Sequence, residues 1–209
     1  MAETNGRLIP LLAMYSSTAE DYFYTTVPQM ALAAHYGTLS PFSVYGTTYA
    51  FVGPSPSGFD RVANGTIDGI LTGAQVWVFS TFQNPNMYGA PLLPLIRLSY
   101  ACPSPSPPPG ACAANNYHVD HALSTNGGGE IAGFLSVGYQ IDGVEGYVYD
   151  PAYTQPSGTV GLLRAYNSTI DDHAVFPSTE QTNMAALGYT LDVTLLGYVY
   201  LVTTSPPPL

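Results

Sequence analysis

Two Asp-His pairs, Asp120-His121 and Asp172-His173, recur in this chain at a spacing of 52 residues (173 − 121). An aspartate beside a histidine can orient the imidazole for base catalysis or for metal binding. The residues that follow, Ala-Leu and Ala-Val, are typical of a strand interior, so a structural role and contact with a sugar are the alternatives to catalysis. No serine elbow, HExxH pair, Cys-His cluster or Walker sequence is present, and we expect no enzyme, no metal and no cofactor.

A longer pattern follows each pair. Residues Glu130–Tyr149 and Glu180–Tyr200 both begin with a glutamate, reach a Gly-Tyr pair at Gly138 and Gly188, place an aspartate three positions after the tyrosine, and end in Gly-Tyr-Val-Tyr. A weaker third copy places Gly37 at the same offset. Self-similarity at this scale indicates that the chain is built from diverged copies of one unit.

Each unit reads as a strand, a loop, a strand that starts with a His or an aromatic residue, a short helix, a Gly-Tyr pair and closing strands. Since one unit is too small to bury its own apolar face, we expect three units to pack about a pseudo-threefold axis. The predicted fold is mostly β with short helices (α+β), in a trefoil-like or closed β architecture. The predicted boundaries are a single domain 1–209, units at about 8–82, 91–150 and 159–202, a Pro-rich loop 101–117 and a Pro-rich tail 203–209.

Several repeated positions are predicted to be structural. Gly37, Gly138 and Gly188 each suit the end of a helix of about two turns, where glycine supplies a positive φ. Arg97 and Arg164 occupy one repeat position in apolar strands. A buried arginine usually needs a carboxylate partner, and recognition of an anion or ligand is the alternative.

Aromatic residues also recur at matching places. Trp77, Tyr147 and Tyr198 would form one row lining the core, whereas rings at the rim would instead stack on sugars. The chain holds 17 Tyr, which suits a polar, neutral ligand. The candidate glycan-binding residues are Asp120, His121, Tyr139, Asp172, His173 and Tyr189.

The charge balance excludes two classes of partner. The chain has no Lys, and its 4 Arg face 14 Asp and Glu, giving a net charge of -10. Nucleic acid and anionic membrane surfaces both require clustered basic residues, so neither is expected. No apolar run approaches the roughly 18 residues of a membrane span.

Other signals bear on location without fixing it. No signal peptide is visible at the N-terminus, yet an extracellular or cell-surface protein is our expectation, with the cytoplasm as the alternative. Cys102 and Cys112 fit either a disulfide or two free thiols. Asn64 and Asn167 begin glycosylation sequons that matter only if the chain is secreted.

The order Leu-x-Arg-x-Tyr, Asp-His-x-x-x-Thr, Glu, Gly-Tyr-x-x-Asp, Gly-Tyr-Val-Tyr resembles the tandem-repeat family called domain of unknown function 5648, whose repeats read like YRFYN…HFYT…E…GVAFYAY. The resemblance spans about residues 8–202 and is loosest in the first unit, where Ala13 replaces the Arg and Tyr22 the His. Members occur in secreted or surface proteins, sometimes beside cell-wall hydrolases. The resemblance therefore implies a loosely lectin-like accessory role in surface or glycan binding.

Three hypotheses for the function follow. The first is a non-catalytic module that binds neutral glycans or cell-wall polysaccharide. The second is a structural protein that assembles into homo-oligomers or filaments through exposed β edges. The third is an inhibitor or toxin-like interaction protein that presents the long loops at 38–65 and 101–117.

Overall fold

The computed structural model describes residues 8–16, 21–27, 30, 42–44, 47–49, 60–61, 66–67, 70–71, 74–80, 90–101, 119–126 and 129–201. Several predictions lie outside these residues and are not addressed by the structure. They concern Gly37, Asn64, Cys102, Cys112, almost all of loop 101–117 and the tail 203–209.

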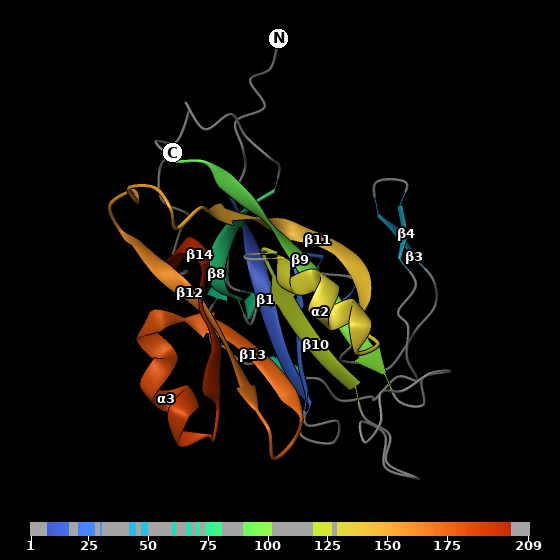
Figure 1. Cartoon of the computed structure of the whole chain (residues 1–209). Coiled ribbons are helices and arrows are strands. Elements are labelled where there is room, and N and C mark those ends of the chain that lie inside the picture. The colour runs from blue at the N-terminus through green and yellow to red at the C-terminus, as the bar shows by residue number, and fades with distance from the viewer. Residues whose placement is uncertain are drawn as a thin grey trace.

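The described chain is mostly β, with two short α-helices and one 3-10 turn, which confirms the predicted secondary-structure class (Figure 1). The strands are β1 (Leu8–Ser16), β2 (Asp21–Thr25), β3 (Phe42–Val44), β4 (Thr47–Tyr49), β5 (Asp60–Arg61), β6 (Thr66–Ile67), β7 (Ile70–Leu71), β8 (Ala74–Phe79), β9 (Leu92–Ala101), β10 (Val119–Ser124), β11 (Gln140–Tyr149), β12 (Thr159–Asn167), β13 (Asp172–Pro177) and β14 (Thr190–Leu201). The helical elements are α2 (Glu130–Ser136), η3 (Ser178–Glu180) and α3 (Gln181–Ala186). None of these described helices has the length and apolar character needed to cross a membrane.

Ten strands form one antiparallel sheet whose main path runs β10-β9-β11-β14-β8-β1-β2. Strands β12 and β13 join this path through β14, and β5 pairs with β1. The pairs β3–β4 and β6–β7 form two small separate sheets. Within the large sheet β9 pairs with both β10 and β11, and β12 likewise pairs with both β13 and β14.

The closing strands β8, β11 and β14 pair with one another through their aromatic ends. The facing pairs are Tyr147 with Phe79, Tyr149 with Tyr198, and Tyr200 with Trp77. These side chains gather around one apolar cluster that includes Leu8 and Leu92. The row of Trp77, Tyr147 and Tyr198 thus packs in or against the core, which is the structural one of the two alternatives considered from the sequence.

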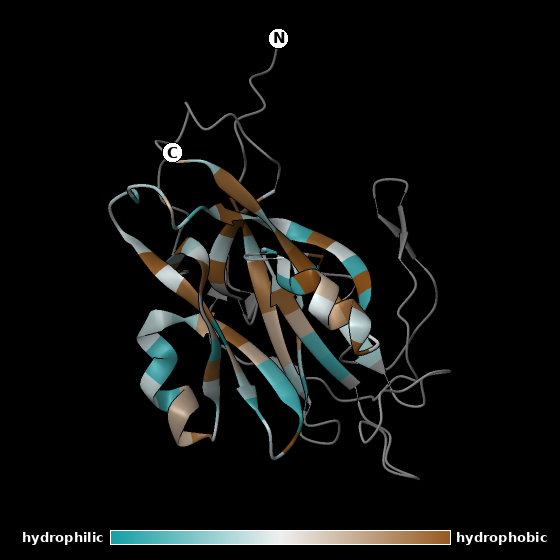
Figure 2. Ribbon diagram, viewed as in Figure 1, coloured by the Kyte–Doolittle hydropathy of each residue, from teal (hydrophilic) through white to brown (hydrophobic). Residues whose placement is uncertain are grey.

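A larger apolar cluster fills the space between the remaining strands. Figure 2 shows hydrophobic residues concentrated on the central strands. The cluster includes Tyr24, Val78, Leu95, Leu123 and Leu196, all buried. Alternation of apolar residues along these strands places one face of each strand in this cluster.

Both short helices end as the sequence predicts. Gly138 follows α2 with φ 102°, and Gly188 follows α3 with φ 92°. Only glycine adopts this left-handed region at no steric cost, so it stops each helix and turns the chain into the next strand. The turn delivers the following residue, Tyr139 or Tyr189, toward the centre of the sheet.

Close approach of strands makes glycine necessary at a second kind of position. A Cβ on Gly146 would lie 2.6 Å from Cγ2 of Val78 and 2.9 Å from the carbonyl oxygen of Phe79. By contrast, a Cβ on Gly133 in α2 would meet nothing within 4 Å.

We expect Gly146→Ala to lower the free energy of unfolding by about 1–3 kcal/mol, because the backbone oxygen of Phe79 cannot move aside without disturbing the sheet. Gly133→Ala is the matched control and should be neutral or stabilising by up to about 1 kcal/mol, since alanine favours a helix interior. Urea titrations of both variants provide the measurement. Equal stabilities would show that the strand contact is looser than described.

Candidate functional site

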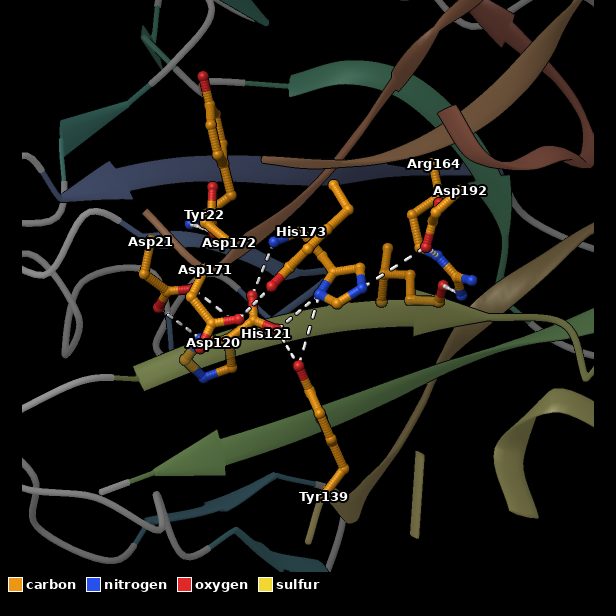
Figure 3. Close-up of polar contacts among 12 residues, drawn as sticks. Asp21, Tyr22, Asp120, His121, Tyr139, Arg164, Asp171, Asp172, His173 and Asp192 are labelled. Carbon is orange, nitrogen blue, oxygen red and sulfur yellow. Dashed lines mark hydrogen bonds and ion pairs between the residues drawn. The ribbon is translucent and has the colours of Figure 1, made fainter. Parts of the chain in front are cut away.

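Three buried aspartates meet where strands β2, β10 and β13 come together. Asp21, Asp120 and Asp172 each contribute a carboxylate oxygen, and these oxygens lie within 4.8 Å of one another (Figure 3). All three side chains are fully or almost fully buried. So much buried negative charge requires compensation from neighbouring donors, cations or protons.

One oxygen of each aspartate accepts a hydrogen bond from the backbone of the next strand. Oδ1 of Asp21 accepts from the N–H of His121 at 3.0 Å, and Oδ1 of Asp120 accepts from the N–H of His173 at 2.7 Å. Oδ1 of Asp172 accepts from the N–H of Tyr22 at 3.0 Å, which returns the series to β2. The three strands are thereby joined in a cycle by side-chain-to-backbone bonds.

The second oxygen of each aspartate takes a side-chain partner. Nδ1 of His121 lies 2.7 Å from Oδ2 of Asp21, and Nδ1 of His173 lies 2.6 Å from Oδ2 of Asp120. The hydroxyl of Tyr139 also donates to Asp120.

In the third position, the hydroxyl of Tyr189 donates to Oδ2 of Asp172. The Gly-Tyr turns after the two helices therefore serve to bring a phenol to a buried carboxylate.

Protonation of the carboxyl groups is a further way in which the cost of burying the aspartates is reduced. Burial raises the pKa of Asp21 well above its usual value, with the negative charge of Asp120 acting in the same direction. Burial, together with the charges of Asp21 and Asp120, raises the pKa of Asp172 to about 9. Burial thus favours the protonated form of both groups, and a pKa of about 9 keeps Asp172 protonated at neutral pH.

Asp120 holds the negative charge of the cluster. Burial opposes its ionisation, but attraction to His173 and hydrogen bonds from His173 and Tyr139 outweigh burial and lower the pKa of Asp120. Burial likewise disfavours the charged form of His173, yet Asp120 raises the pKa of this imidazole. Burial lowers the pKa of His121 to about 4, so this imidazole is neutral.

These positions correct part of the predicted ligand-binding set. Asp120, His121, Asp172 and Tyr189 are buried, because their polar atoms point into the aspartate cluster where β2, β10 and β13 meet. A ligand on the surface of the folded protein has no access to them. His173 and Tyr139 differ, since both also line a cavity.

The cavity has a volume of about 500 Å³ and lies between α2 and the strands β12 and β14. Its walls combine aromatic and charged side chains. The lining residues are Tyr100, Glu130, Gly133, Phe134, Val137, Tyr139, Arg164, Tyr166, Asp171, His173 and Asp192.

Arg164 forms the best-supported part of this wall. Its Nε donates to Oδ2 of Asp192 at 2.8 Å and its Nη2 to Oε2 of Glu130 at 2.9 Å. Nη1 donates to the carbonyl oxygen of Leu123 at 2.9 Å, and Cζ lies 4.9 Å from the ring centroid of Phe134. The guanidinium is fixed on all sides and holds two cavity carboxylates in place.

Arg97 has the corresponding contacts elsewhere in the sheet. Its Nε donates to Asp142 at 3.0 Å, its Nη1 to Glu145 at 2.5 Å and to the carbonyl oxygen of Tyr24 at 3.1 Å, and Cζ lies 5.0 Å from the Phe23 ring centroid. Both arginines thus lie buried against carboxylates, the structural alternative in the sequence analysis.

Sequence reasoning missed several residues of the site. Asp21 is the counterpart of Asp120 and Asp172, and the signal for it is the Asp21-Tyr22 pair in the first unit. Glu130 and Asp192 belong to the repeated pattern but were not considered as ligand contacts. Tyr166 is the tyrosine of the Leu-x-Arg-x-Tyr pattern and was likewise not considered as a ligand contact. Three other missed cavity residues, Tyr100, Phe134 and Asp171, show no pattern that distinguishes them from other loop and strand residues.

Asn167 is a correction as well. The residue is only 6% exposed, its Nδ2 donates to the carbonyl oxygen of Leu187 at 3.1 Å, and its Oδ1 accepts from the N–H of Thr169 at 3.0 Å. A glycan attached to Nδ2 is incompatible with this packing, because the same amide fixes the turn after α3. The sequon is therefore structural in the folded chain.

We expect Arg97→Leu to destabilise the protein more than Arg164→Leu. The partners of Arg97, Asp142 and Glu145, have side chains 15% and 5% exposed, whereas Glu130 and Asp192 beside Arg164 are 21% and 23% exposed. Leaving a buried carboxylate without its cation typically lowers the free energy of unfolding by about 3–5 kcal/mol, and the loss is smaller for a carboxylate that water can reach. Chemical denaturation of both variants measures the difference, and an equal or reversed order would contradict it.

The raised pKa of Asp172 makes stability depend on pH. The folded-state pKa of Asp172, about 9, lies above its unfolded value of 3.8. The stability that this carboxyl contributes is therefore fully present below pH 3.8 and is lost progressively as pH rises toward about 9, because only the unfolded state releases the proton in that range. We expect the free energy of unfolding to fall between about pH 7 and pH 9, by at most about 1.4 kcal/mol per pH unit for this proton.

Asp172→Asn should flatten that slope, because the amide cannot ionise while its oxygen can still accept from the N–H of Tyr22. Denaturation curves of wild type and variant over this pH range supply the test. Slopes that stay parallel would mean that Asp172 is ionised in the folded protein.

Comparison with known proteins gives one family match. The model of the family described as Domain of unknown function (DUF5648) matches residues 113–199, which include β10 to β13, both helices and most of β14. The match is shorter than the span of about 8–202 over which the sequence resembles that family. No curated protein and no solved structure matches the chain. Residues 113–199 are thus similar to the DUF5648 family, which confirms the predicted resemblance for this part of the chain.

Proposed function

We propose that the protein is a non-catalytic glycan-binding module whose ligand occupies the cavity between α2 and the strands β12 and β14. The observation that carries the proposal is the cavity itself, about 500 Å³ in volume and lined by both aromatic rings and charged groups. This volume lies in the range of small-ligand sites and suits one or two sugar rings. Aromatic rings offer apolar contact to sugar C–H groups, and carboxylates accept hydrogen bonds from hydroxyls.

The arrangement around His173 supports binding rather than catalysis. Its Nδ1 lies 2.6 Å from Asp120 and its Nε2 lies 3.5 Å from Oδ2 of Asp192. A general base needs a ring nitrogen that can reach the substrate proton. With a carboxylate beside each nitrogen, this imidazole is better suited to fixing the wall of a binding site.

The proposal includes the architecture of three diverged units and an extracellular or cell-surface location. The cycle of bonds from Asp21 to His121, Asp120 to His173 and Asp172 to Tyr22 supports three related units, because each bond joins one unit to the next. A neutral glycan or cell-wall polysaccharide is the ligand that composition favours.

Self-association is the second candidate function. Among the residues that the structure describes, seven large apolar ones are more than a third exposed, including Leu135 in α2, Val137 after it, Ile141 and Val144 on β11, and Leu187 after α3. Exposed apolar groups of this kind are common at interfaces between proteins. Light scattering over a range of protein concentrations separates this candidate from a monomeric binding module.

The test of the cavity uses Gly133→Phe with a glycan array. Gly133 lines the cavity and its Cβ position is open, so a phenylalanine there would fill the space without a clash at Cβ. We expect wild-type protein to bind at least one class of glycan, and Gly133→Phe to lose that binding.

The control is Ala132→Phe, which places the same ring on an exposed position of α2 that does not line the cavity. It should bind like wild type. Binding that survives in Gly133→Phe would move the site elsewhere, and wild-type protein that binds no glycan would contradict the proposed function.

A further inference from the structure

We infer that the cavity selects a glycan that carries a protonated amine, such as an oligosaccharide of amino sugars whose nitrogen is not acetylated. The inference rests on the proposed function, since it assumes a sugar in this cavity. It departs from the neutral ligand that composition suggests, because the described groups bonded around Arg164 and His173 include more carboxylates than cations.

Among the residues that the structure describes, the ionic groups bonded to one another at the cavity include more carboxylates than cations. Glu130 and Asp192 line the cavity together with Arg164 and His173. Asp120 adds a third carboxylate directly behind His173, at 2.6 Å from its Nδ1. A ligand with one positive charge would reduce this imbalance, whereas an anionic ligand would increase it.

Both cations are already neutralised by groups of the protein. Arg164 has two carboxylate partners, at 2.8 and 2.9 Å, and its side chain is buried. His173 has Asp120 on its inner side. Neither cation is therefore left to recognise an anion, and the surplus carboxylates define the preference of the site.

One carboxylate oxygen is placed to accept from a ligand. In Asp192, Oδ2 meets both Arg164 and His173, while Oδ1 has no hydrogen-bond partner among the residues that the structure describes. Asp192 is partly exposed and lines the cavity, so Oδ1 can accept from an ammonium group. Figure 3 shows Asp192 beside Arg164, with His173 next to them.

The aromatic walls favour the same kind of ligand. Tyr100, Phe134, Tyr139 and Tyr166 line the cavity, and aromatic ring faces attract cations. Phe134 already takes part in such a contact, with the Arg164 guanidinium carbon 4.9 Å from its centroid. Rings combined with surplus carboxylates resemble the general chemistry by which proteins recognise ammonium groups.

The test compares three trisaccharides with the same β-1,4 linkage that differ only at C2: fully deacetylated glucosamine trimer, N-acetylglucosamine trimer and cellotriose. Calorimetry is carried out at a pH at which the free amines are protonated. We expect the amine trimer to bind at least about tenfold more tightly than the other two, the scale of one charge-assisted hydrogen bond. That advantage should shrink as salt is added, because salt screens the attraction between charges.

Variants locate the effect. Asp171→Asn and Asp192→Asn each remove one charge from the cavity, and asparagine tolerates the φ of 59° that Asp171 adopts. Both should lower the preference for the amine trimer. Asp150→Asn is the matched control, because it removes the same charge at a position that does not line the cavity, and it should retain the preference.

The outcomes distinguish this inference from the proposed function. Equal affinity for the three trisaccharides would overturn the amine preference and leave the glycan-binding proposal standing. A preference lost equally in Asp150→Asn and Asp171→Asn would overturn the assignment to this cavity and point to the overall charge of the protein. If none of the trisaccharides binds while the array identifies another glycan, the inference alone fails; if the array also identifies none, both fail.

Discussion

The structure depends on the burial of three aspartates at the junction of β2, β10 and β13. Buried carboxyl groups are costly unless they are hydrogen-bonded, protonated or paired with a cation, and here each of these means is used. Asp21 and Asp172 are favoured in the protonated form, Asp120 pairs with His173, and every Oδ1 accepts a backbone N–H. The strands cannot shift against one another without leaving one of these groups unsatisfied.

His173 connects this interior cluster to the cavity. One ring nitrogen faces the buried Asp120, and the other faces Asp192 in the cavity wall. Tyr139 spans the same boundary, since its hydroxyl donates to Asp120 while the residue lines the cavity. The positions of His173 and Tyr139 in the wall of the candidate site therefore depend on their bonds to Asp120 inside the sheet. A change in the protonation of the aspartate cluster would alter the contacts that these two side chains make with a bound ligand.

The sequence was informative where a local rule decides the outcome. A glycine after a short helix predicts a positive φ, as at Gly138 and Gly188, and an arginine in an apolar strand predicts a carboxylate partner, as at Arg164. It was uninformative about which face of a strand lies inside. His121 and Asp172 were predicted to contact a surface ligand because their partners, Asp21 and Tyr22, lie 100 and 150 residues away in the chain, and position 22 carries no histidine to complete the pattern.

The cycle of aspartate bonds also affects the rate at which the chain can fold. The bond from Tyr22 to Asp172 joins residues 150 positions apart, and the bond from His121 to Asp21 joins residues 100 apart. Contacts of such large sequence separation slow folding, because loop-closure entropy is lost before the contact forms. During synthesis β2 can pair early with β1, but β13 is made much later, so the bond from Tyr22 to Asp172 forms only after most of the chain has been made. The amino-terminal hairpin, although it is made first, therefore gains its last aspartate bond only when β13 is in place.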